Sequence, residues 1–572
     1  MKIYDCIMFN GEHDVLEVRL NELDPLVDHF FICESLEPHG AAGTRKYQKF
    51  DQSLVQDFKD KITYIALNYL EPTYTDAKSG WARENFHRNA LFQHLLKLTN
   101  PVIGPEDIIL NCDADEIPRP QAVVAVAETA PDDQVVYFDM LMYYYNVNNQ
   151  VNCAWRRANM GKFKVYQKLG GFQAPRGILD MPLTSGTPIV VVKNGGWHFS
   201  YFSGVDGVLD KVRSFAHSSD AASKKIAEKT GREIAEMISS RADPFHEGVK
   251  FVYAPCTDLR LPTSVTQRRQ HFAKLTGEYF DTVNNVLPPK TCGTTDAVIG
   301  VIRNYDWGNI KPYALSLAQS GFKGEKIMFC KNVSRACQTR LTETGFTVIP
   351  YVDSPETDAA EAGSYMVFNV HRFRPVIEFL SKHADKYRNI LWCDVRDVVF
   401  QSNPGHFMKS KLTGPIRILA ASEGFRISEN MEYNDRWLAA AAPEAYKELR
   451  NNEVCCDGTI AADASMMLRL FERIYERAIV AGNDQGVFNY LIRKPYAHVT
   501  RIPSQTEGFI STWFPEKTAE RAPNLPDSYG GIPVFDETSG VVYTPDGRTK
   551  FAVVHQFDRS PRWSKIFQEK FA

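Results

Sequence analysis

Short apolar runs alternate with amphipathic segments along the first half of the chain. Two segments, 14–23 and 81–98, space their apolar residues as a helix does. The strand-like runs cover 3–9, 29–35, 61–67, 107–116, 134–146 and 187–199. Strands that alternate with helices predict an α/β domain built on a mainly parallel sheet.

The same alternation restarts after residues 286–295, where two prolines and a glycine stand among polar residues. Strands are expected at 296–302, 325–330, 346–351 and 389–400, and helices at 309–321, 338–345 and 367–383. We therefore expect two domains, 1–285 and 296–572, joined by a linker at 286–295. Each half places a long helix before an apolar strand that ends in acids.

These strand-end acids are the first candidates for chemistry. Asp113 and Asp115 end one strand, and Asp394 and Asp397 end its counterpart. Ligands of open α/β sheets bind outside the carboxyl ends of the strands. Neighbouring carboxylates repel unless a cation neutralises them, and Mg²⁺ or Mn²⁺ prefers such oxygens while also holding phosphates. The pattern favours metal-bridged binding of a nucleotide diphosphate over a solvated turn, although a lone pair of acids is a weak signal.

A histidine follows a late strand in each half. His198 comes after a double glycine, and His555 ends the last strand-like run. Acids midway and a histidine late, in both halves, is the order expected when two acids and a histidine share one metal. The alternative for His198 is a hydrogen-bonded histidine beside an aromatic cluster.

Composition narrows the class of protein. The 572 residues carry a net charge of −3, which gives no general electrostatic attraction to nucleic acid. The eleven cysteines lack the spacing of a disulfide framework or zinc site, which favours a reducing compartment. No apolar run approaches the roughly 20 residues of a membrane-spanning helix, and no signal peptide stands at the start. We expect a soluble cytoplasmic protein without a membrane anchor.

Five blocks of the first half resemble glycosyltransferase family 17: "MKIYDCIMFNGEHDVLEVRLNELDPLVDHFFICES", "WARENFHRNAL", "DADEIP", "GGWHFSYF" and "KVRSFAHSS". The resemblance runs from Met1 to about Leu275. It implies a GT-A-type fold, a nucleotide-sugar donor such as a UDP-sugar, and inversion at the anomeric carbon. It also implies that Asp113 binds the donor, and that Asp115 and His198 hold Mn²⁺ or Mg²⁺.

The resemblance suggests further donor-binding residues. Lys211, Arg213 and His217 would face the diphosphate, and Arg83 and Arg88 lie with Glu84 in the matching helix. A salt-bridged helix face explains those last three equally well. The catalytic base stays open between Asp139, Asp180 and Glu116.

The second half resembles a different GT-A-like group through "ILWCDVRDVVFQSNP", "NDQGVFNYL" and "HQFDR". There we expect Asp397 and His555 to bind the metal and Asp394 to lie nearer the nucleotide ribose. Arg396 either forms a salt bridge or holds phosphate. Asp484 is either a catalytic acid on the acceptor side or a helix N-cap.

The sequence thus predicts two tandem GT-A-type, Rossmann-like domains of a metal-dependent, bifunctional glycosyltransferase that adds sugars to a growing glycan. One active domain beside a degenerate glycan-binding domain is an alternative. A sugar-nucleotide nucleotidyltransferase would need a glycine-rich phosphate loop, and "IMFNGEHD" has one glycine. A glycoside hydrolase would need two carboxylates and no metal.

Overall fold

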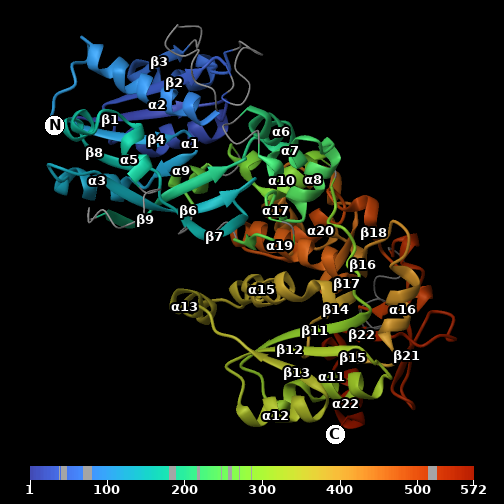
Figure 1. Cartoon of the computed structure of the whole chain (residues 1–572). Coiled ribbons are helices and arrows are strands. Elements are labelled where there is room, and N and C mark those ends of the chain that lie inside the picture. The colour runs from blue at the N-terminus through green and yellow to red at the C-terminus, as the bar shows by residue number, and fades with distance from the viewer. Residues whose placement is uncertain are drawn as a thin grey trace. The chain divides into compact units, whose positions relative to one another are not determined.

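A computed structural model describes most of the chain, in two compact units, Met1–Leu287 and Pro288–Ala572 (Figure 1). The described residues are 1–37, 39, 48–67, 80–178, 189–214, 220–246, 248–254, 261–268, 271–284, 286–512 and 525–571. Asp180 and His217 lie outside them. Among the helices within these ranges, none has the length and apolar character to cross a membrane.

The first unit is built on one mixed sheet. Four parallel strands stand in the order β3-β2-β1-β4: β1 (Ile3–Phe9), β2 (His29–Ser35), β3 (Ile62–Leu67) and β4 (Ile108–Asp113). The sheet continues beyond β4 through β8 (Asn159–Lys162), β6 (Val136–Tyr144), β7 (Asn149–Trp155) and β10 (Val252–Tyr253). β9 (Val190–Ser200) pairs with β6 and with β5 (Glu116–Pro118). Because β8 runs antiparallel to β4, the sheet is mixed rather than mainly parallel.

Alternation along β1 sends its side chains to two helical layers. Ile7 and Phe9 pack with α1 (His13–Leu23) and α3 (Pro120–Thr129). Tyr4 and Cys6 pack on the other face with α2 (Gly80–Lys97) and α4 (Phe163–Leu169). Burial on both faces explains why these strands are continuously apolar. The other helices of the unit are α5 (Gln173–Ile178), α6 (Gly204–Ser214), α7 (Ala221–Ala227), α8 (Gly231–Ser239), α9 (Thr263–Gln267) and α10 (Gly277–Asn284).

The second unit repeats the order of the parallel strands, β13-β12-β11-β14. They are β11 (Thr295–Arg303), β12 (Glu325–Lys331), β13 (Phe346–Pro350) and β14 (Tyr387–Cys393). Next come β17 (Glu453–Asp463), which is antiparallel to β14, then β16 (Ile418–Arg426) and β18 (Thr500–Arg501). Two smaller sheets are β15 (Val398–Phe400)–β22 (Val553–His555)–β19 (Ile510–Ser511) and β20 (Val534–Asp536)–β21 (Val541–Tyr543).

Helices of the second unit cover its main sheet. Val298, Leu391 and Leu419 of the sheet are buried together with Ile310 and Leu317 of α11. The helices are α11 (Trp307–Gln319), α12 (Arg335–Glu343), α13 (Pro355–Gly363), α14 (Tyr365–His371), α15 (Phe373–His383), α16 (Pro404–Lys411), α17 (Asn434–Ala441), α18 (Tyr446–Leu449), α19 (Ala464–Ala481), α20 (Gln485–Leu491) and α22 (Pro561–Lys570). In both units, the last parallel strand carries the acids at its carboxyl end.

Residues 288–295, most of the expected linker, pack into the second unit. The buried Arg417 donates from Nη1 to the carbonyl of Pro288 at 2.5 Å. Lys290 Nζ donates to the Gly414 carbonyl at 3.3 Å, and the Thr291 hydroxyl donates to the Tyr387 carbonyl. A buried guanidinium needs acceptors, so it holds this proline-rich segment in place.

Candidate active sites

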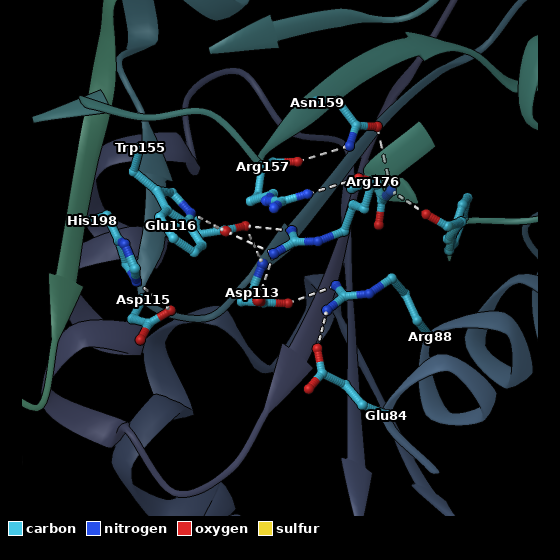
Figure 2. A network of polar contacts seen from close by, with 12 residues as sticks. Glu84, Arg88, Asp113, Asp115, Glu116, Trp155, Arg157, Asn159, Arg176 and His198 are labelled. Atoms are coloured by element: carbon cyan, nitrogen blue, oxygen red, sulfur yellow. Dashed lines mark hydrogen bonds and ion pairs between the residues drawn. The ribbon is translucent and has the colours of Figure 1, made fainter. Parts of the chain in front are cut away.

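The acid cluster of the first unit sits in the turn between β4 and β5 (Figure 2). Asp113 is the last residue of β4, and its N–H donates to Glu116 Oε2 at 2.8 Å. The carbonyl of Asp115 accepts a 2.8 Å bond from the Phe199 N–H, next to His198 on β9. The turn therefore places Asp113 and Asp115 at the carboxyl end of the parallel strands, beside His198.

Two arginines hold Asp113. Arg88 of α2 donates from Nη1 to Oδ1 at 2.6 Å, and Arg176 of α5 donates from Nη2 to Oδ2 at 2.9 Å. Burial opposes ionisation, but Arg176 and Arg88 outweigh it and lower the pKa of Asp113 to about 2. Arg176 also binds Glu116 through two bonds of 2.8 and 2.9 Å. Asp113 is thus a fixed anion whose two oxygens are both in use.

Asp115 is held by a lysine and lies beside a histidine. Lys211 Nζ of α6 lies 2.7 Å from Oδ2, and His198 Nε2 lies 3.5 Å from Oδ1. Against the effect of burial, these two neighbours keep the pKa of Asp115 well below its ordinary value. Burial works against the charge of Lys211 as well, yet Asp115 and then Glu12 raise its pKa. Asp115 and Lys211 are therefore a charged pair.

His198 is packed rather than fully bonded. Its ring centroid lies 4.6 Å from that of Trp155, whose indole N–H donates to Glu116 Oε1 at 2.5 Å. Its Nδ1 is buried, with no hydrogen-bond partner among the described residues. The structure brings the two acids and the late histidine together, and the Trp155 contact matches the aromatic neighbour of the alternative reading.

Other predicted residues of the first unit lie in different contacts. Arg213 donates to the Ala227 carbonyl at 2.9 Å, so it joins α6 to α7. Arg83 donates to the carbonyl of His39. Asp139 on β6 pairs with Arg156 at 2.8 Å and Lys193 at 3.1 Å. Burial raises the pKa of Asp139, but Arg156 and Lys193 outweigh burial and leave the pKa lowered.

The three candidate catalytic bases of the first unit differ in their contacts. Glu116 is fully buried and bonded to Arg176, Trp155 and the Asp113 N–H, so an acceptor cannot reach it. Asp139 is occupied by its two cations. Asp180, the third candidate, falls outside the described residues.

The second unit brings Asp394, Asp397 and His555 together. Asp394 follows β14, and a short turn leads into β15, whose Val398 pairs with His555 of β22. His555 Nε2 lies 3.7 Å from Asp394 Oδ2 and 3.8 Å from Asp397 Oδ1. One potential ligand atom from each of the three residues lies within 4.8 Å of the others, which suits a metal ion. Both ring nitrogens of His555 are buried and, in the part of the chain described, have no hydrogen-bond partner.

The electrostatics of this trio call for positive charge. Burial raises the pKa of Asp397, and Asp394 adds to that effect against His555. Burial opposes the charge of His555, but Asp397 and Asp394 raise its pKa. A divalent cation would relieve the repulsion between the two acids and give His555 Nε2, which faces both acids, a partner. The donor set therefore fits Mn²⁺ or Mg²⁺.

A glycine on β17 makes room for this trio. Gly458 accepts at its carbonyl from the Asp394 N–H at 2.7 Å. A Cβ at this position would lie 2.4 Å from Asp394 Oδ2 and 2.9 Å from His555 Cε1. Because Gly458 has no side chain, the Asp394 carboxylate and the His555 ring can occupy the space beside its Cα.

Arg372 connects the trio to a second pair of acids. It lies at the junction of α14 and α15 and contacts Asp394 at 2.5 Å, Asp484 at 3.2 Å and Asp457 at 3.3 Å. Burial and the neighbouring Asp484 raise the pKa of Asp457 well above its ordinary value. Asp484 also caps α20, accepting from the Gln485 N–H at 3.0 Å, which matches the N-cap reading of this residue. Arg396, in contrast, pairs with Asp558 at 3.1 Å.

Among the described residues, one other acid group has the spacing of metal ligands, namely Asp353, Asp358 and Glu361. Lys331 Nζ already lies 2.7, 2.6 and 2.7 Å from these three carboxylates. Its ammonium takes the place that a cation would take, so we assign no metal there.

Several residues of both sites could not be identified from the sequence. Arg176, Trp155, Asp457 and Gly458 carry no recognisable motif. The position of Arg372 in the sequence could have identified it. Like Arg88, it lies in the long helical region before a strand that ends in acids, and each of these arginines contacts the first acid of its own unit.

Comparison with known proteins separates the two units. Residues 1–247 match the family model of glycosyltransferase family 17. The resemblance of the N-terminal half is thereby confirmed, and the match does not extend into the second unit. The β-1,4-mannosyl-glycoprotein 4-β-N-acetylglucosaminyltransferases of Rattus norvegicus and Homo sapiens are each 31% identical over 128 residues, covering 22% of this chain and 23% of theirs. The chain thus matches about a quarter of the length of these relatives.

Solved structures give weaker likenesses. The galactosyltransferase LgtC, in complex with donor and acceptor sugar analogues, has a TM-score of 0.33 at 11% identity, over 48% of this chain and 95% of its own. Mouse xyloside xylosyltransferase 1 has a TM-score of 0.30 at 12% identity, over 47% and 99%. Scores this low do not by themselves establish a common fold.

Proposed function

We propose that the chain is a bifunctional glycosyltransferase, with one transfer site in each unit, that moves sugars from nucleotide-sugar donors to a growing glycan. The observation that carries the proposal is the family 17 match over residues 1–247, which includes the acid cluster after β4. UDP-sugars are the donors proposed for the first unit. The second site rests on the repeated strand order and on its own acid–histidine trio.

In the first unit, fixed charges would stabilise the departing diphosphate. An acceptor hydroxyl attacks the anomeric carbon while the bond from that carbon to the diphosphate oxygen breaks. Lys211, partly exposed and anchored by Asp115, offers an ammonium to the developing negative charge. Asp113, fixed by Arg88 and Arg176, would orient the donor with its carboxylate. The base that takes the hydroxyl proton is not assigned.

In the second unit, Asp397, His555 and Asp394 would hold Mn²⁺ or Mg²⁺. When bound, the ion supplies Lewis acidity to the diphosphate oxygens. Asp457 and Asp484 lie on the other side of Arg372, and the raised pKa of Asp457 allows this pair to keep one proton between them. A carboxyl pair that shares a proton can accept a hydrogen bond from an acceptor hydroxyl and then its proton. Arg372 would position the pair relative to Asp394.

A panel of nucleotide sugars with the full chain tests the proposal. We expect two donor-dependent transfer activities, one lost in Asp115→Asn and the other in Asp397→Asn. Asp132→Asn, an exposed acid of the first unit paired with Lys162, is the matched control and should keep both activities. If Asp397→Asn changes no activity, the second unit is a degenerate domain. If neither active-site variant changes any activity, the assignment of both sites is wrong.

A further inference from the structure

The second acid of each unit meets a different electrostatic environment. In the first unit, Lys211 Nζ lies 2.7 Å from Asp115 Oδ2. Among the described residues of the second unit, the cationic partners of Asp397 are His555 and Arg559, each at 3.8 Å. An ammonium therefore lies against Asp115, whereas no cationic nitrogen of the described residues lies as close to Asp397.

The distances between acids and cations differ in the same direction. The three carboxylates Asp113, Asp115 and Glu116 are contacted within 3 Å by the three cations Arg88, Arg176 and Lys211. In the second unit, Arg372 contacts Asp394, Asp457 and Asp484 within 3.3 Å, whereas the partners described for Asp397 are His555 and Arg559, each at 3.8 Å. A buried acid needs compensation, so a cation beside Asp397 would supply the close partner that Asp115 already has in Lys211.

The first site also offers a poor set of ligands. Both oxygens of Asp113 are taken by arginines, and Asp115 Oδ2 by Lys211. What remains is Asp115 Oδ1 and a nitrogen of His198, while Mg²⁺ and Mn²⁺ favour oxygen-rich coordination. An ion bound there would repel the nearby ammonium. The expected metal site at Asp115 and His198 therefore does not fit the contacts of this unit.

We infer that Lys211 replaces the divalent cation in the first unit, so that this unit binds a nucleoside diphosphate without metal while the second unit requires it. The inference rests on the proposed function and concerns how each site holds its diphosphate. Lys211 suits the role because Asp115 and, at 3.5 Å, Glu12 hold its ammonium, and its side chain keeps about a fifth of its surface exposed. Lysine binds phosphate as a compact point charge.

Counting bound Mn²⁺ by electron paramagnetic resonance on the full chain, with saturating UDP or GDP, tests the metal half of the inference. We expect one ion per chain. Asp397→Asn should abolish its binding, and Asp115→Asn should leave it unchanged. Two ions per chain, or loss of an ion in Asp115→Asn, would overturn the inference.

Binding of UDP and GDP in the presence of a chelator tests the lysine. We expect one nucleotide site per chain to persist, to weaken at least tenfold in Lys211→Met, and to be largely kept in Lys211→Arg. Lys164→Met, which removes a lysine that pairs with Glu106 and Asp132, is the matched control and should bind like the wild type. If the first site binds nucleotide only with Mn²⁺, the inference fails and the proposed function stands. If neither nucleotide binds under any condition, both fail.

Discussion

Gly458→Ala is the substitution that most directly tests the second site. Gly458 lies on β17, and its carbonyl binds the Asp394 N–H at 2.7 Å. An added Cβ would lie 2.4 Å from Asp394 Oδ2 and 2.9 Å from His555 Cε1. Both distances are below the 3.0 Å under which real Cβ contacts essentially never occur, so Asp394 or His555 must move. Either movement displaces a proposed metal ligand.

The expected cost has two parts. Forcing a methyl group into a packed site typically costs about 1–3 kcal/mol of stability. A displaced Asp394 also strains its 2.5 Å contact with Arg372, which lies among buried acids. We therefore expect the second unit to be destabilised by about 2 kcal/mol. Mn²⁺ affinity should fall at least tenfold, which corresponds to about 1.4 kcal/mol.

Mn²⁺ titration and thermal melting of the full chain measure the two effects separately. Gly363→Ala is the matched control, because an added Cβ there meets nothing within 4 Å. It should bind Mn²⁺ and melt like the wild type. If Gly458→Ala also binds Mn²⁺ with wild-type affinity, the ion is not held by Asp394 and His555, and the trio is not the metal site.

Two other perturbations test the fold around the sites. Burial lowers the pKa of His87 on α2 to about 4, whereas a histidine in the unfolded chain protonates near 6.5. The stability that neutral His87 contributes is therefore fully present above about pH 6.5 and is lost as the pH falls toward 4. Denaturant unfolding of the first unit should show that His87→Gln removes about 3 kcal/mol of this pH dependence, and equal pH profiles would contradict the burial argument. In the second unit, a fragment 292–572 lacks the Pro288 carbonyl that accepts from buried Arg417. It should be about 1.5–3 kcal/mol less stable than 288–572, and equal melting would show that the segment contributes nothing.

The strands, the helices between them and the acids at their ends could be predicted because each rests on a local pattern. An apolar run bounded by polar residues predicts a buried strand, and the rule for ligands at the carboxyl ends of strands then selects Asp113 and Asp394. The late histidines were found in the same way. In both units, the structure brings the histidine within 4 Å of an acid.

The partners of the acids could not be predicted, since they come from distant segments. Arg176 is 63 residues from Asp113, and Lys211 is 96 residues from Asp115. Nothing local distinguishes either residue from a surface cation on a helix. Arg213, two residues from Lys211 on α6, looked equivalent in the sequence, yet it binds the Ala227 carbonyl. Only the direction in which each side chain leaves the helix separates the two.

This dependence on distant partners limits what an acid motif can say about metal. In both units, an arginine close before the acid-bearing strand fixes the first acid, Arg88 at 2.6 Å and Arg372 at 2.5 Å. The strand order is also shared. In the described parts of the two units, a lysine contacts the second acid of the first unit but not that of the second. A scaffold that holds carboxylates at a strand end can balance their charge with the ammonium of a lysine or with an ion from solution. Which of the two is used depends on residues that are distant from the acid motif in the sequence. Metal dependence should therefore be inferred from the contacts of the second acid and not from the spacing of the two.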